Sequence, residues 1–463
     1  MILFGMFMDL LDGGVLNVAL PEIQQEMGAS SAALQWMVAG YALSFALGLI
    51  TGGRLGDIYG RKRVFVIGMA LFTLTSVLCS VAQSPGQLVA ARVAQGLAAS
   101  LMVPQVMATI QVMYAPSERG RPITAAGALY AITSVLGPII GALLTESDIA
   151  GLGWRTIFLV NVPVGVIALI AAIRYVPESR SETAVRLDLA GVLLAGLAML
   201  LLLYPLVAGR EAGWPAWTFV SMAASLPVFA IFVAHQRRKV DSPLVPLSLF
   251  RHGSFTGGLL ILLLAMGGVV GFFLVFTVYL QDGLGYDVMR AGVTGIWWGI
   301  ASSVFAALAI NLLAARMGRL VVQIGLLTVV AGLLGLMWVT RSLDAEVTPG
   351  SLVVPLLLGG AGMGFAISLV FDFALSSVPL DDAGAASGVL NAFQQAASAV
   401  GIAVVGALFF ALMPTGEPGG AEWAADSSDA FATAMWLPVG MTLLAFAASF
   451  LLPRQAAHHD TAP

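Results

Sequence analysis

Long apolar segments alternate with short polar ones along all 463 residues. A bilayer core requires about 20 apolar residues per helix, and fourteen segments approach or exceed this length. We therefore predict fourteen membrane-spanning helices, at residues 2–20, 33–53, 64–82, 87–107, 123–144, 156–175, 189–208, 217–235, 255–280, 291–312, 319–339, 351–376, 385–412 and 431–452. The segments that connect the predicted helices, such as "YAPSERGRP" and "QRRKVDSPLVP", contain Pro, Gly and charged residues.

The composition supports an all-α polytopic membrane protein. Hydrophobic residues make up 59% of the chain and charged residues 10%, whereas soluble domains carry about 25% charged residues. The single cysteine, Cys79, excludes disulfides and cysteine metal sites. No phosphate-binding G-x-x-x-x-G-K motif occurs, so we expect an ion gradient to supply energy and no bound cofactor.

The distribution of basic residues orients the helices. With the N-terminus inside, 16 Arg and Lys residues fall in inside loops and 4 in outside loops, while Arg92 falls within a span. This asymmetry follows the positive-inside rule, and a miscounted helix would have scrambled it. Both termini are therefore predicted to be cytoplasmic. Scarce lysine with abundant Arg, Ala and Gly hints at a GC-rich bacterial genome, and we predict the bacterial cytoplasmic membrane.

The N-terminus shows no secretory signal. It lacks a basic leading region and a small-residue cleavage site, and Met1 falls almost inside the first helix. We expect a cytoplasmic tail to be missing through truncation or choice of start site.

The chain reads as two related halves. "GRLGDIYGRKR" follows the second span and a degraded echo, "AARMGRLVV", follows the tenth. Parallel repeats of this kind occur in secondary transporters. We predict an N-terminal six-helix half at 1–180, two inserted helices with flanking linkers at 181–240, a C-terminal six-helix half at 241–455, and a cytoplasmic tail at 456–463.

The loop after the second span carries a signature. In "GGRLGDIYGRKRV", Gly48, Gly52 and Gly56 give the preceding helix a smooth face for close packing. The pattern G-x-L-a-D-r-x-G-r-k is met by Gly53, Leu55, Asp57, Gly60, Arg61 and Lys62. Here the chain resembles the major facilitator superfamily. The resemblance implies a cytoplasmic latch in which Asp57 and Arg61 bias the inward–outward equilibrium; the alternative is a plain basic loop.

Further motifs sharpen the resemblance. Arg92, Gln95 and Gly96 match R-x-x-Q-G, and Gly137, Pro138 and Gly141 match the antiporter pattern G-P-x-x-G. "LLDGGVLNVALP" is similar to the first-helix motif L-D-x-T-I-V-N-V-A-L-P, with Gly13 and Gly14 where Thr is common. With fourteen spans, the chain resembles the 14-helix drug:H⁺ antiporter branch. The resemblance implies a packing seal at Gly137-Pro138; the alternative is a passive kink.

Three charged residues, Asp9, Asp12 and Arg92, fall well inside the predicted spans, away from the span ends. A rise of 1.5 Å per residue puts Asp12 roughly 12 Å and Arg92 roughly 8 Å below the outer boundary, so they can pair if their helices face each other. Asp9 shares a helix face with Asp12 and would titrate with it as a coupled set. We predict that Asp12, Arg92 and Asp9 couple transport to protons. The alternative is a structural ion pair.

Deep polar and aromatic residues are candidates for a substrate cavity, because aromatic faces can bind organic cations. Ordinary helix packing is the alternative for each. The candidates are Tyr41, Gln95, Phe276, Trp297, Asn391, Gln394 and Gln395.

These features predict a proton-coupled secondary transporter that exports amphiphilic or cationic drugs by alternating access. It would bind a small-molecule substrate in the lipid bilayer, bind no nucleic acid or metal, use H⁺ as coupling ion and function as a monomer. Alternatives are export of an endogenous metabolite, antibiotic or lipid, and proton-coupled uptake. An intramembrane enzyme would need a nucleophile–base set or metal cluster that the spans lack, and a transport-dead sensor would not need the coupling charges.

Overall fold

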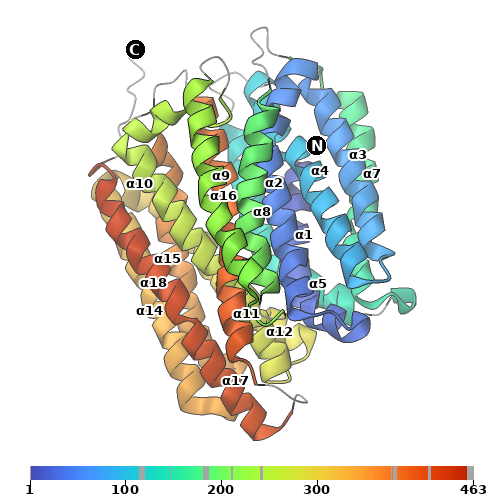
Figure 1. Cartoon of the computed structure of the whole chain (residues 1–463), viewed down its shortest axis with the longest axis vertical. Helices are drawn as coiled ribbons and strands as arrows, with labels where there is room; N and C mark the ends of the chain where they lie inside the picture. Colours follow the sequence, from blue (N-terminus) through green and yellow to red (C-terminus); the bar gives the residue numbers. More distant parts are fainter. Residues whose placement is uncertain are drawn as a thin grey trace. The chain divides into compact units, whose positions relative to one another are not determined.

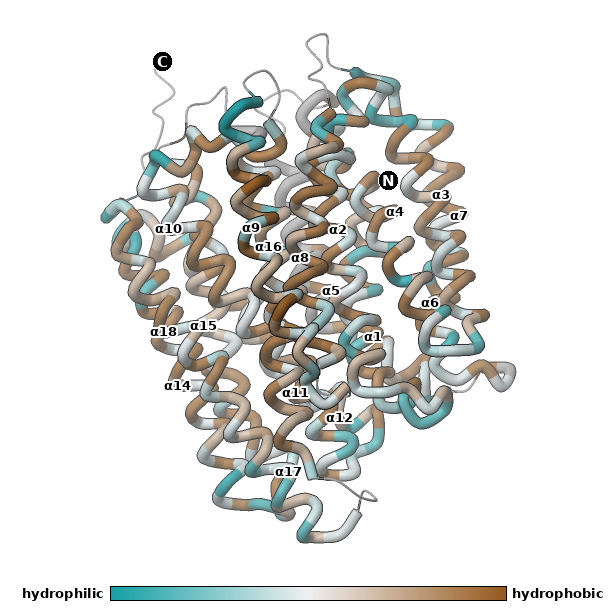
Figure 2. Tube along the Cα trace, in the orientation of Figure 1, coloured by the Kyte–Doolittle hydropathy of each residue, from teal (hydrophilic) through white to brown (hydrophobic). Residues whose placement is uncertain are grey.

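The helices of the protein coincide with the apolar segments. The computed structural model describes residues 2–113, 120–147, 149–180, 187–209, 212–239, 243–376, 378, 383–414 and 419–455. All regular structure in these residues is helical, without a strand. Thirteen helical segments there are long and apolar enough to cross a membrane, and α5 (Gly120–Glu146) occupies the remaining predicted span. Hydrophobic residues dominate the middle of the helices and hydrophilic residues gather at their ends (Figure 2). The protein is therefore a multi-pass membrane protein.

The chain divides into two compact units (Figure 1). Unit 1 comprises Met1–Leu244 and Asp287–Gly292, and unit 2 comprises Val245–Tyr286 and Val293–Pro463. The helices of unit 1 are α1 (Leu3–Met27), α2 (Ser31–Tyr59), α3 (Arg61–Ser80), α4 (Pro85–Met113), α5, α6 (Thr156–Leu159), α7 (Asn161–Tyr175), α8 (Leu189–Ala208) and α9 (Ala216–Arg238). The predicted division at 180, 240 and 455 stays a prediction, and residues 456–463 lie outside the described residues.

Local sequence sets the ends of the first helices. Gly28 ends α1 in the left-handed region at φ 60°, which glycine adopts without steric cost. The Ser30 hydroxyl accepts a hydrogen bond from the Ala33 N–H at 3.2 Å and caps α2. Gly60 has φ 108° and separates α2 from α3. These three residues turn the chain sharply between consecutive membrane spans.

The glycine face of α2 packs against α4. A Cβ on Gly52 would lie 1.9 Å from the Ser100 carbonyl oxygen, and one on Gly56 would lie 1.9 Å from Gln105 Oε1. A Cβ on Gly48 would likewise meet Ser100 Oγ at 2.1 Å. The predicted smooth face is thus present, and its neighbour is α4. Close packing of this kind requires that none of the three carries a side chain.

Unit 2 contains the remaining helices. They are α10 (Gly253–Ile261), α11 (Gly267–Val278), most of α12 (Val288–Leu308), α13 (Ala314–Met317), α14 (Arg319–Leu343), α15 (Pro349–Leu375), α16 (Ala383–Leu412), α17 (Gly420–Ala434) and α18 (Trp436–Ala448). A π-helical turn at Leu262–Met266 joins α10 to α11, so that Gly253–Gly283 forms one span. Buried aromatic rings fill its core: Phe272 stacks on Phe276 at 5.2 Å, and Tyr279 stacks on Phe431 at 4.5 Å.

The two copies of the loop motif fold alike. In unit 1 the Arg61 N–H, after Gly60, donates to the Ser179 carbonyl at 2.8 Å. In unit 2 the Arg319 N–H, after Gly318 at φ 55°, donates to the Arg454 carbonyl at 3.1 Å. Each bond ties the start of a helix to a segment that follows a later helix of the same unit, α7 for Ser179 and α18 for Arg454. The echo seen in the sequence therefore reflects a shared local structure.

Candidate functional site

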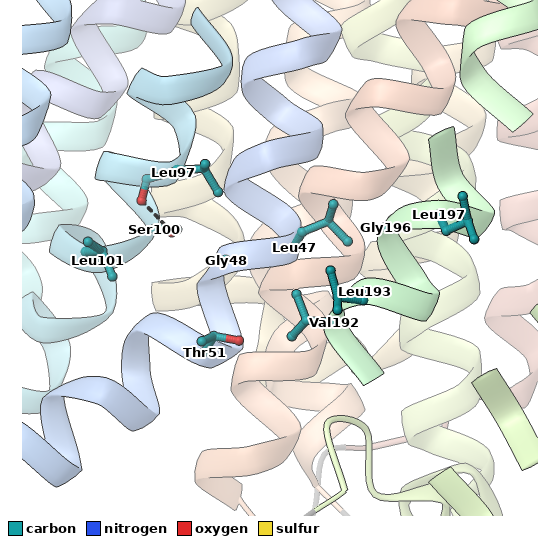
Figure 3. A pocket seen from close by; sticks show the side chains of 10 residues that line it. All are labelled: Leu47, Gly48, Thr51, Leu97, Ser100, Leu101, Val192, Leu193, Gly196 and Leu197. Carbon is teal, nitrogen blue, oxygen red and sulfur yellow. Dashed lines mark hydrogen bonds between the residues drawn. The ribbon is translucent and has the colours of Figure 1, made fainter. Parts of the chain in front are cut away.

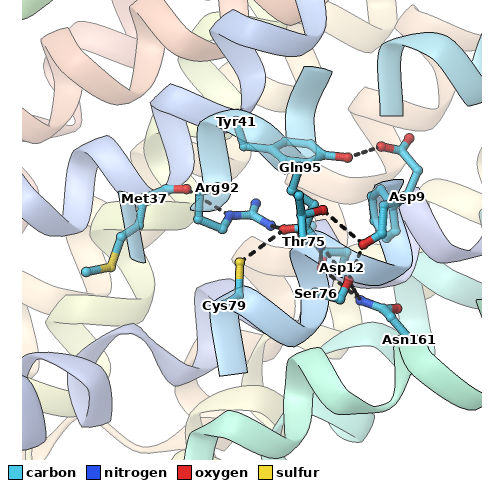
Figure 4. A network of polar contacts seen from close by, with 12 residues as sticks. Asp9, Asp12, Met37, Tyr41, Thr75, Ser76, Cys79, Arg92, Gln95 and Asn161 are labelled. Atoms are coloured by element: carbon cyan, nitrogen blue, oxygen red, sulfur yellow. Dashed lines mark hydrogen bonds and ion pairs between the residues drawn. The ribbon is translucent and has the colours of Figure 1, made fainter. Parts of the chain in front are cut away.

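Asp12 and Arg92 form a buried ion pair in unit 1. Asp12 lies on α1 and Arg92 on α4, and each is 1% exposed. Arg92 Nη1 donates a hydrogen bond to Asp12 Oδ2 (Figure 4). The depth estimate made these two residues potential partners, and the packing of α1 against α4 brings them together. An isolated charge at this depth would be costly, so the contact satisfies both side chains.

Two amides complete the surroundings of Asp12. Gln95 Nε2 donates to Asp12 Oδ1 at 2.9 Å, and Asn161 Nδ2 donates to the same oxygen at 3.0 Å. Both amides also contact Ser76 Oγ, at 3.0 and 3.4 Å. Residues of α4 and α7 thus bond to the carboxylate of α1, and Ser76 of α3 bonds to both amides (Figure 4).

Arg92 has other partners besides Asp12. Its Nε donates to the Met37 carbonyl at 3.1 Å, and its Nη1 donates to Gln95 Oε1 at 2.6 Å. The guanidinium carbon lies 4.2 Å from the centre of the Tyr41 ring, a distance at which a cation is attracted to the ring face. Arg92 would therefore keep three favourable contacts if Asp12 lost its charge.

Asp9 is connected to this pair through Tyr41. The Tyr41 hydroxyl donates a hydrogen bond to Asp9 Oδ1, and the same ring faces Arg92. Asp9 is half-buried, whereas Asp12 is buried. The two acids of α1 thus differ in their surroundings: Asp12 contacts a cation and two amides, and Asp9 contacts a neutral hydroxyl.

Sequence reasoning missed Asn161 and Ser76. Asn161 is 1% exposed, and its Oδ1 is buried without a hydrogen-bond partner among the described residues. A lone amide in the apolar stretch "FLVNVPVG" was the available signal, because a buried amide usually requires a partner. Ser76 gave no signal, since its hydroxyl also donates to the carbonyl of Phe72 in its own helix at 2.9 Å.

The Gly137-Pro138 element packs against the first helix. A Cβ on Gly14 would lie 3.2 Å from Gly137 Cα, and one on Gly141 would lie 2.9 Å from Val15 Cα. Nothing lies within 4 Å of a Cβ placed on Gly13. Of the two unusual glycines in α1, Gly14 therefore serves the close approach of α5. The packing role is visible here, and the sealing role of Gly137, Pro138 and Gly141 stays a prediction.

The loop motif forms a compact set of polar contacts. Asp57 Oδ1 accepts a hydrogen bond from Arg61 Nη2 at 2.8 Å, one turn along the chain. Lys62 Nζ donates to the Ile173 carbonyl at 2.7 Å, and the Lys62 N–H donates to Glu178 Oε1 at 3.1 Å. A Cβ on Gly53 would lie 3.7 Å from Pro104 Cβ. Glu178, which the motif search did not single out, thus holds the N-terminus of α3.

A second buried acid, Asp188, anchors the hairpin of α8 and α9. Its side chain is fully buried at the N-terminus of α8. It accepts hydrogen bonds from Gln236 Nε2 at 2.8 Å and Lys239 Nζ at 2.9 Å, and it lies 2.9 Å from His235 Nε2. Burial raises the pKa of Asp188, but the hydrogen bonds from His235, Lys239 and Gln236 outweigh this and hold that pKa well below its usual range.

The residues predicted to line a substrate cavity lie in several environments. Tyr41 and Gln95 are buried in the Asp12 network, and Phe276 is buried against Phe272. Trp297 is 37% exposed and Asn391 is exposed. Gln394 and Gln395 are half-buried on α16. Their contact with substrate stays a prediction, and among the described residues no cluster of His, Cys, Asp and Glu could hold a metal ion.

A comparison with family models decides the relationship. Residues 2–402 match the model described as "Major Facilitator Superfamily". The chain belongs to the major facilitator superfamily. Its buried Asp12–Arg92 pair, its loop motif and its Gly137-Pro138 element are therefore features of a facilitator-superfamily transporter, a class that handles small molecules in membranes.

Curated relatives within the superfamily carry the names of antibiotic transporters. The chain is 42% identical to the "Probable actinorhodin transporter" of Streptomyces coelicolor, over 88% of this chain and 71% of the relative. It is 34% identical to the "Multidrug resistance protein Stp" of Mycobacterium tuberculosis, over 89% and 76% of the two chains. It is 32% identical to the "Puromycin resistance protein pur8" of Streptomyces alboniger, over 87% and 80%.

Solved structures of other transporters share the fold. A bacterial homologue of the lysosomal transporter Spinster matches with a TM-score of 0.69 at 16% identity, over 99% of this chain and 97% of that one. The peptide transporter POT matches with a TM-score of 0.67 at 15% identity, over 97% and 94%. At this identity the likeness establishes the fold alone.

Proposed function

We propose that this transporter exports amphiphilic or cationic small molecules in exchange for protons, by alternating access across the bacterial cytoplasmic membrane. The observation that carries the proposal is the buried network in which Asp12 contacts Arg92, Gln95 and Asn161. Ionisable groups inside a membrane protein commonly mark proton pathways. Membership of the 14-helix drug:H⁺ antiporter branch, proposed on the Gly137-Pro138 element, agrees with export.

Asp12 is the proposed proton carrier and Arg92 its partner. A proton on Asp12 would remove the charge that Arg92 neutralises. The Met37 carbonyl, Gln95 Oε1 and the Tyr41 ring already contact the guanidinium, so Arg92 would not be left without partners. Asp12 can then gain and lose a proton without the collapse of the site. Asp9, bonded to Tyr41, is the auxiliary acid that titrates with it.

The loop motif is the proposed cytoplasmic latch. Asp57 and Arg61 hold each other at 2.8 Å, and Lys62 contacts the end of α7 through the Ile173 carbonyl. These contacts stiffen the turn between α2 and α3 of unit 1. The latch role requires that they differ between the inward-open and outward-open states, because only such a difference biases the equilibrium on which alternating access depends.

A second candidate is the export of an endogenous antibiotic or other metabolite. The relatives named for actinorhodin and puromycin favour it, together with the "Cephamycin export protein CmcT" of Amycolatopsis lactamdurans, which is 33% identical over 96% of this chain. Both candidates use the same site and the same coupling, so they differ only in substrate.

Transport in proteoliposomes tests the coupling. Purified protein is reconstituted with an internal pH dye and offered cationic dyes, polyketide and aminonucleoside antibiotics, with and without an uncoupler. We expect substrate-driven proton movement in the wild type and none in Asp12→Asn. Asn17→Ala is the matched control, because Asn17 also lies on α1 and its side-chain amide donates to the Gly13 carbonyl of the same helix. Unchanged proton movement in Asp12→Asn would remove the coupling role. Accumulation of substrate in the direction of the proton gradient would instead indicate uptake.

A further inference from the structure

A cavity of about 490 Å³ lies in unit 1 between α2, α4 and α8. Its walls are mostly apolar side chains, with the hydroxyls of Thr51 and Ser100 among them: Leu47, Gly48, Thr51, Leu97, Ser100, Leu101, Val192, Leu193, Gly196 and Leu197. Figure 3 shows Leu47 and Thr51 of α2 facing Val192 and Leu193 of α8. This volume is within the range of small-molecule binding pockets, about 300–1,000 Å³.

The cavity is separate from the Asp12 site. On α4, Leu97 follows Gln95 by two residues, which rotates it roughly 200° around the helix. Gln95 contacts Asp12, so Leu97 lies on the opposite face of α4. Leu97 is 49% exposed and Leu193 is 73% exposed, and both lie in membrane-spanning helices. The cavity is therefore open at Leu97 and Leu193, within the membrane-spanning part of these helices.

The two ends of the cavity differ in chemistry. Toward the middle of the membrane it is closed by Leu47 and Gly196, since a Cβ on Gly196 would lie 3.2 Å from Leu47 Cδ1. At the other end, one turn beyond Thr51 and Val192, lie Arg54 and Asp188. Lys239 contacts Asp188 at 2.9 Å.

Among the described residues, basic side chains outnumber acidic ones around Asp188 at the polar end. Arg54 and Lys239 face one carboxylate, Asp188, and His235 adds a titratable group. Arg54 Nη2 donates to the Pro243 carbonyl at 2.5 Å, which fixes the start of the linker beside this end. We define the three basic residues around Asp188 as the basic rim: Arg54, His235 and Lys239.

We propose that this groove binds one anionic phospholipid, with an acyl chain between α2, α4 and α8 and the phosphate at the basic rim. The chemistry is complementary at both ends, because the cavity is apolar where the bilayer is apolar and positive where lipid phosphates lie. Basic pockets between membrane helices on the cytoplasmic side bind anionic headgroups, and the positive-inside rule predicts that the rim is cytoplasmic. A bound lipid would fill the space between the α8–α9 hairpin and the rest of unit 1.

Lipid titration of the full-length protein in nanodiscs or mixed micelles, read by native mass spectrometry, tests the site. The probes are phosphatidylglycerol and phosphatidylcholine of the same acyl length. We expect one retained phosphatidylglycerol per chain, in preference to phosphatidylcholine. The double variant Arg54→Gln/Lys239→Gln should weaken phosphatidylglycerol binding about five-fold for each charge removed. Arg174→Ala/Arg180→Ala, which removes two exposed basic residues elsewhere in unit 1, is the matched control.

Filling the cavity provides the second arm. Val192→Phe should reduce retention of the lipid, whereas Ile167→Phe, at a position of α7 that is 61% exposed, should not. Leu197→Phe, at the edge of the cavity, repeats the test should Val192→Phe fail to fold. Three results would overturn the proposal. The first is equal retention of the two lipids, and the second is wild-type retention in both cavity variants. The third is a two-chain species that these variants abolish. The last result would assign the groove to a second copy of the chain.

Discussion

The guanidinium carbon of Arg92 lies 4.2 Å from the centre of the Tyr41 ring. The hydroxyl of the same ring donates a hydrogen bond to Asp9, and Arg92 donates one to Asp12. Tyr41 therefore contacts one acid of α1, Asp9, and also Arg92, which is the partner of the other acid, Asp12. Because the ring and the hydroxyl have different contacts, their contributions can be separated by substitution.

Tyr41→Phe keeps the ring over Arg92 and removes the hydroxyl from Asp9. We expect this variant to fold with near wild-type stability but to show an altered pH dependence of transport. Tyr41→Leu removes both contacts and should cost about 2 kcal/mol more, because a desolvated cation loses its aromatic partner. Thermal unfolding and transport at several pH values measure the two effects. An unchanged pH profile in Tyr41→Phe would reduce Tyr41 to a packing residue.

Gly52 and Gly53 are adjacent but should respond differently to alanine. In Gly52→Ala the new Cβ would sit 1.9 Å from the Ser100 carbonyl oxygen, a backbone atom that cannot move alone. The strain should separate α2 from α4 and cost about 1–3 kcal/mol, as overpacking does. In Gly53→Ala the Cβ would meet Pro104 at an ordinary 3.7 Å. We expect Gly53→Ala to unfold at the wild-type temperature and Gly52→Ala several degrees lower; equal values would contradict the packing argument.

Glu178 should stabilise the start of α3. Its Oε1 accepts hydrogen bonds from the N–H groups of Lys62 and Ser179, each at 3.1 Å. An anion at a helix N-terminus also interacts favourably with the helix dipole. Glu178→Ala should cost about 1–2 kcal/mol, and Glu178→Gln, which keeps an acceptor, should cost less. Thermal unfolding of the two variants measures the difference. If Glu178→Gln and Glu178→Ala both unfold at the wild-type temperature, Glu178 does not stabilise the start of α3.

Asp188 should stabilise the protein at neutral pH and lose this effect in acid. Its pKa is held well below the usual value by hydrogen bonds from His235, Lys239 and Gln236. A depressed pKa in the folded state stabilises the protein above the unfolded pKa of about 3.9, and the stabilisation declines as pH falls below it. Asp188→Asn should therefore lower the unfolding temperature by a constant amount between pH 5 and pH 8. The gap should narrow below about pH 4. If the difference in unfolding temperature between Asp188→Asn and the wild type does not narrow below about pH 4, the charge of Asp188 does not stabilise the protein.

The sequence by itself determined the helices and the class of the protein. Backbone groups in hydrocarbon must bond within their own segment, so fourteen apolar stretches of sufficient length had to be helical, and helices occupy all of them. Composition excluded a soluble protein, and the loop motif with Arg92, Gln95 and Gly137-Pro138 pointed to the family. Helix rise also put Asp12 and Arg92 at compatible depths, so that they could pair if their helices faced each other.

Only the tertiary structure decided which helices meet, and so which side chains share a site. Asn161 lies 149 residues from Asp12 along the chain, and nothing in the spacing of either residue marks their hydrogen bond. The packing of α2 and α4 against α1 places Tyr41 and Gln95 in the Asp12 network, which their positions in the sequence did not indicate for Tyr41. Gly13 and Gly14 look equivalent in the sequence, and only Gly14 meets α5. The apolar pattern within a segment fixes its depth and its helicity, whereas its rotation and its neighbours depend on contacts with segments far away in the chain.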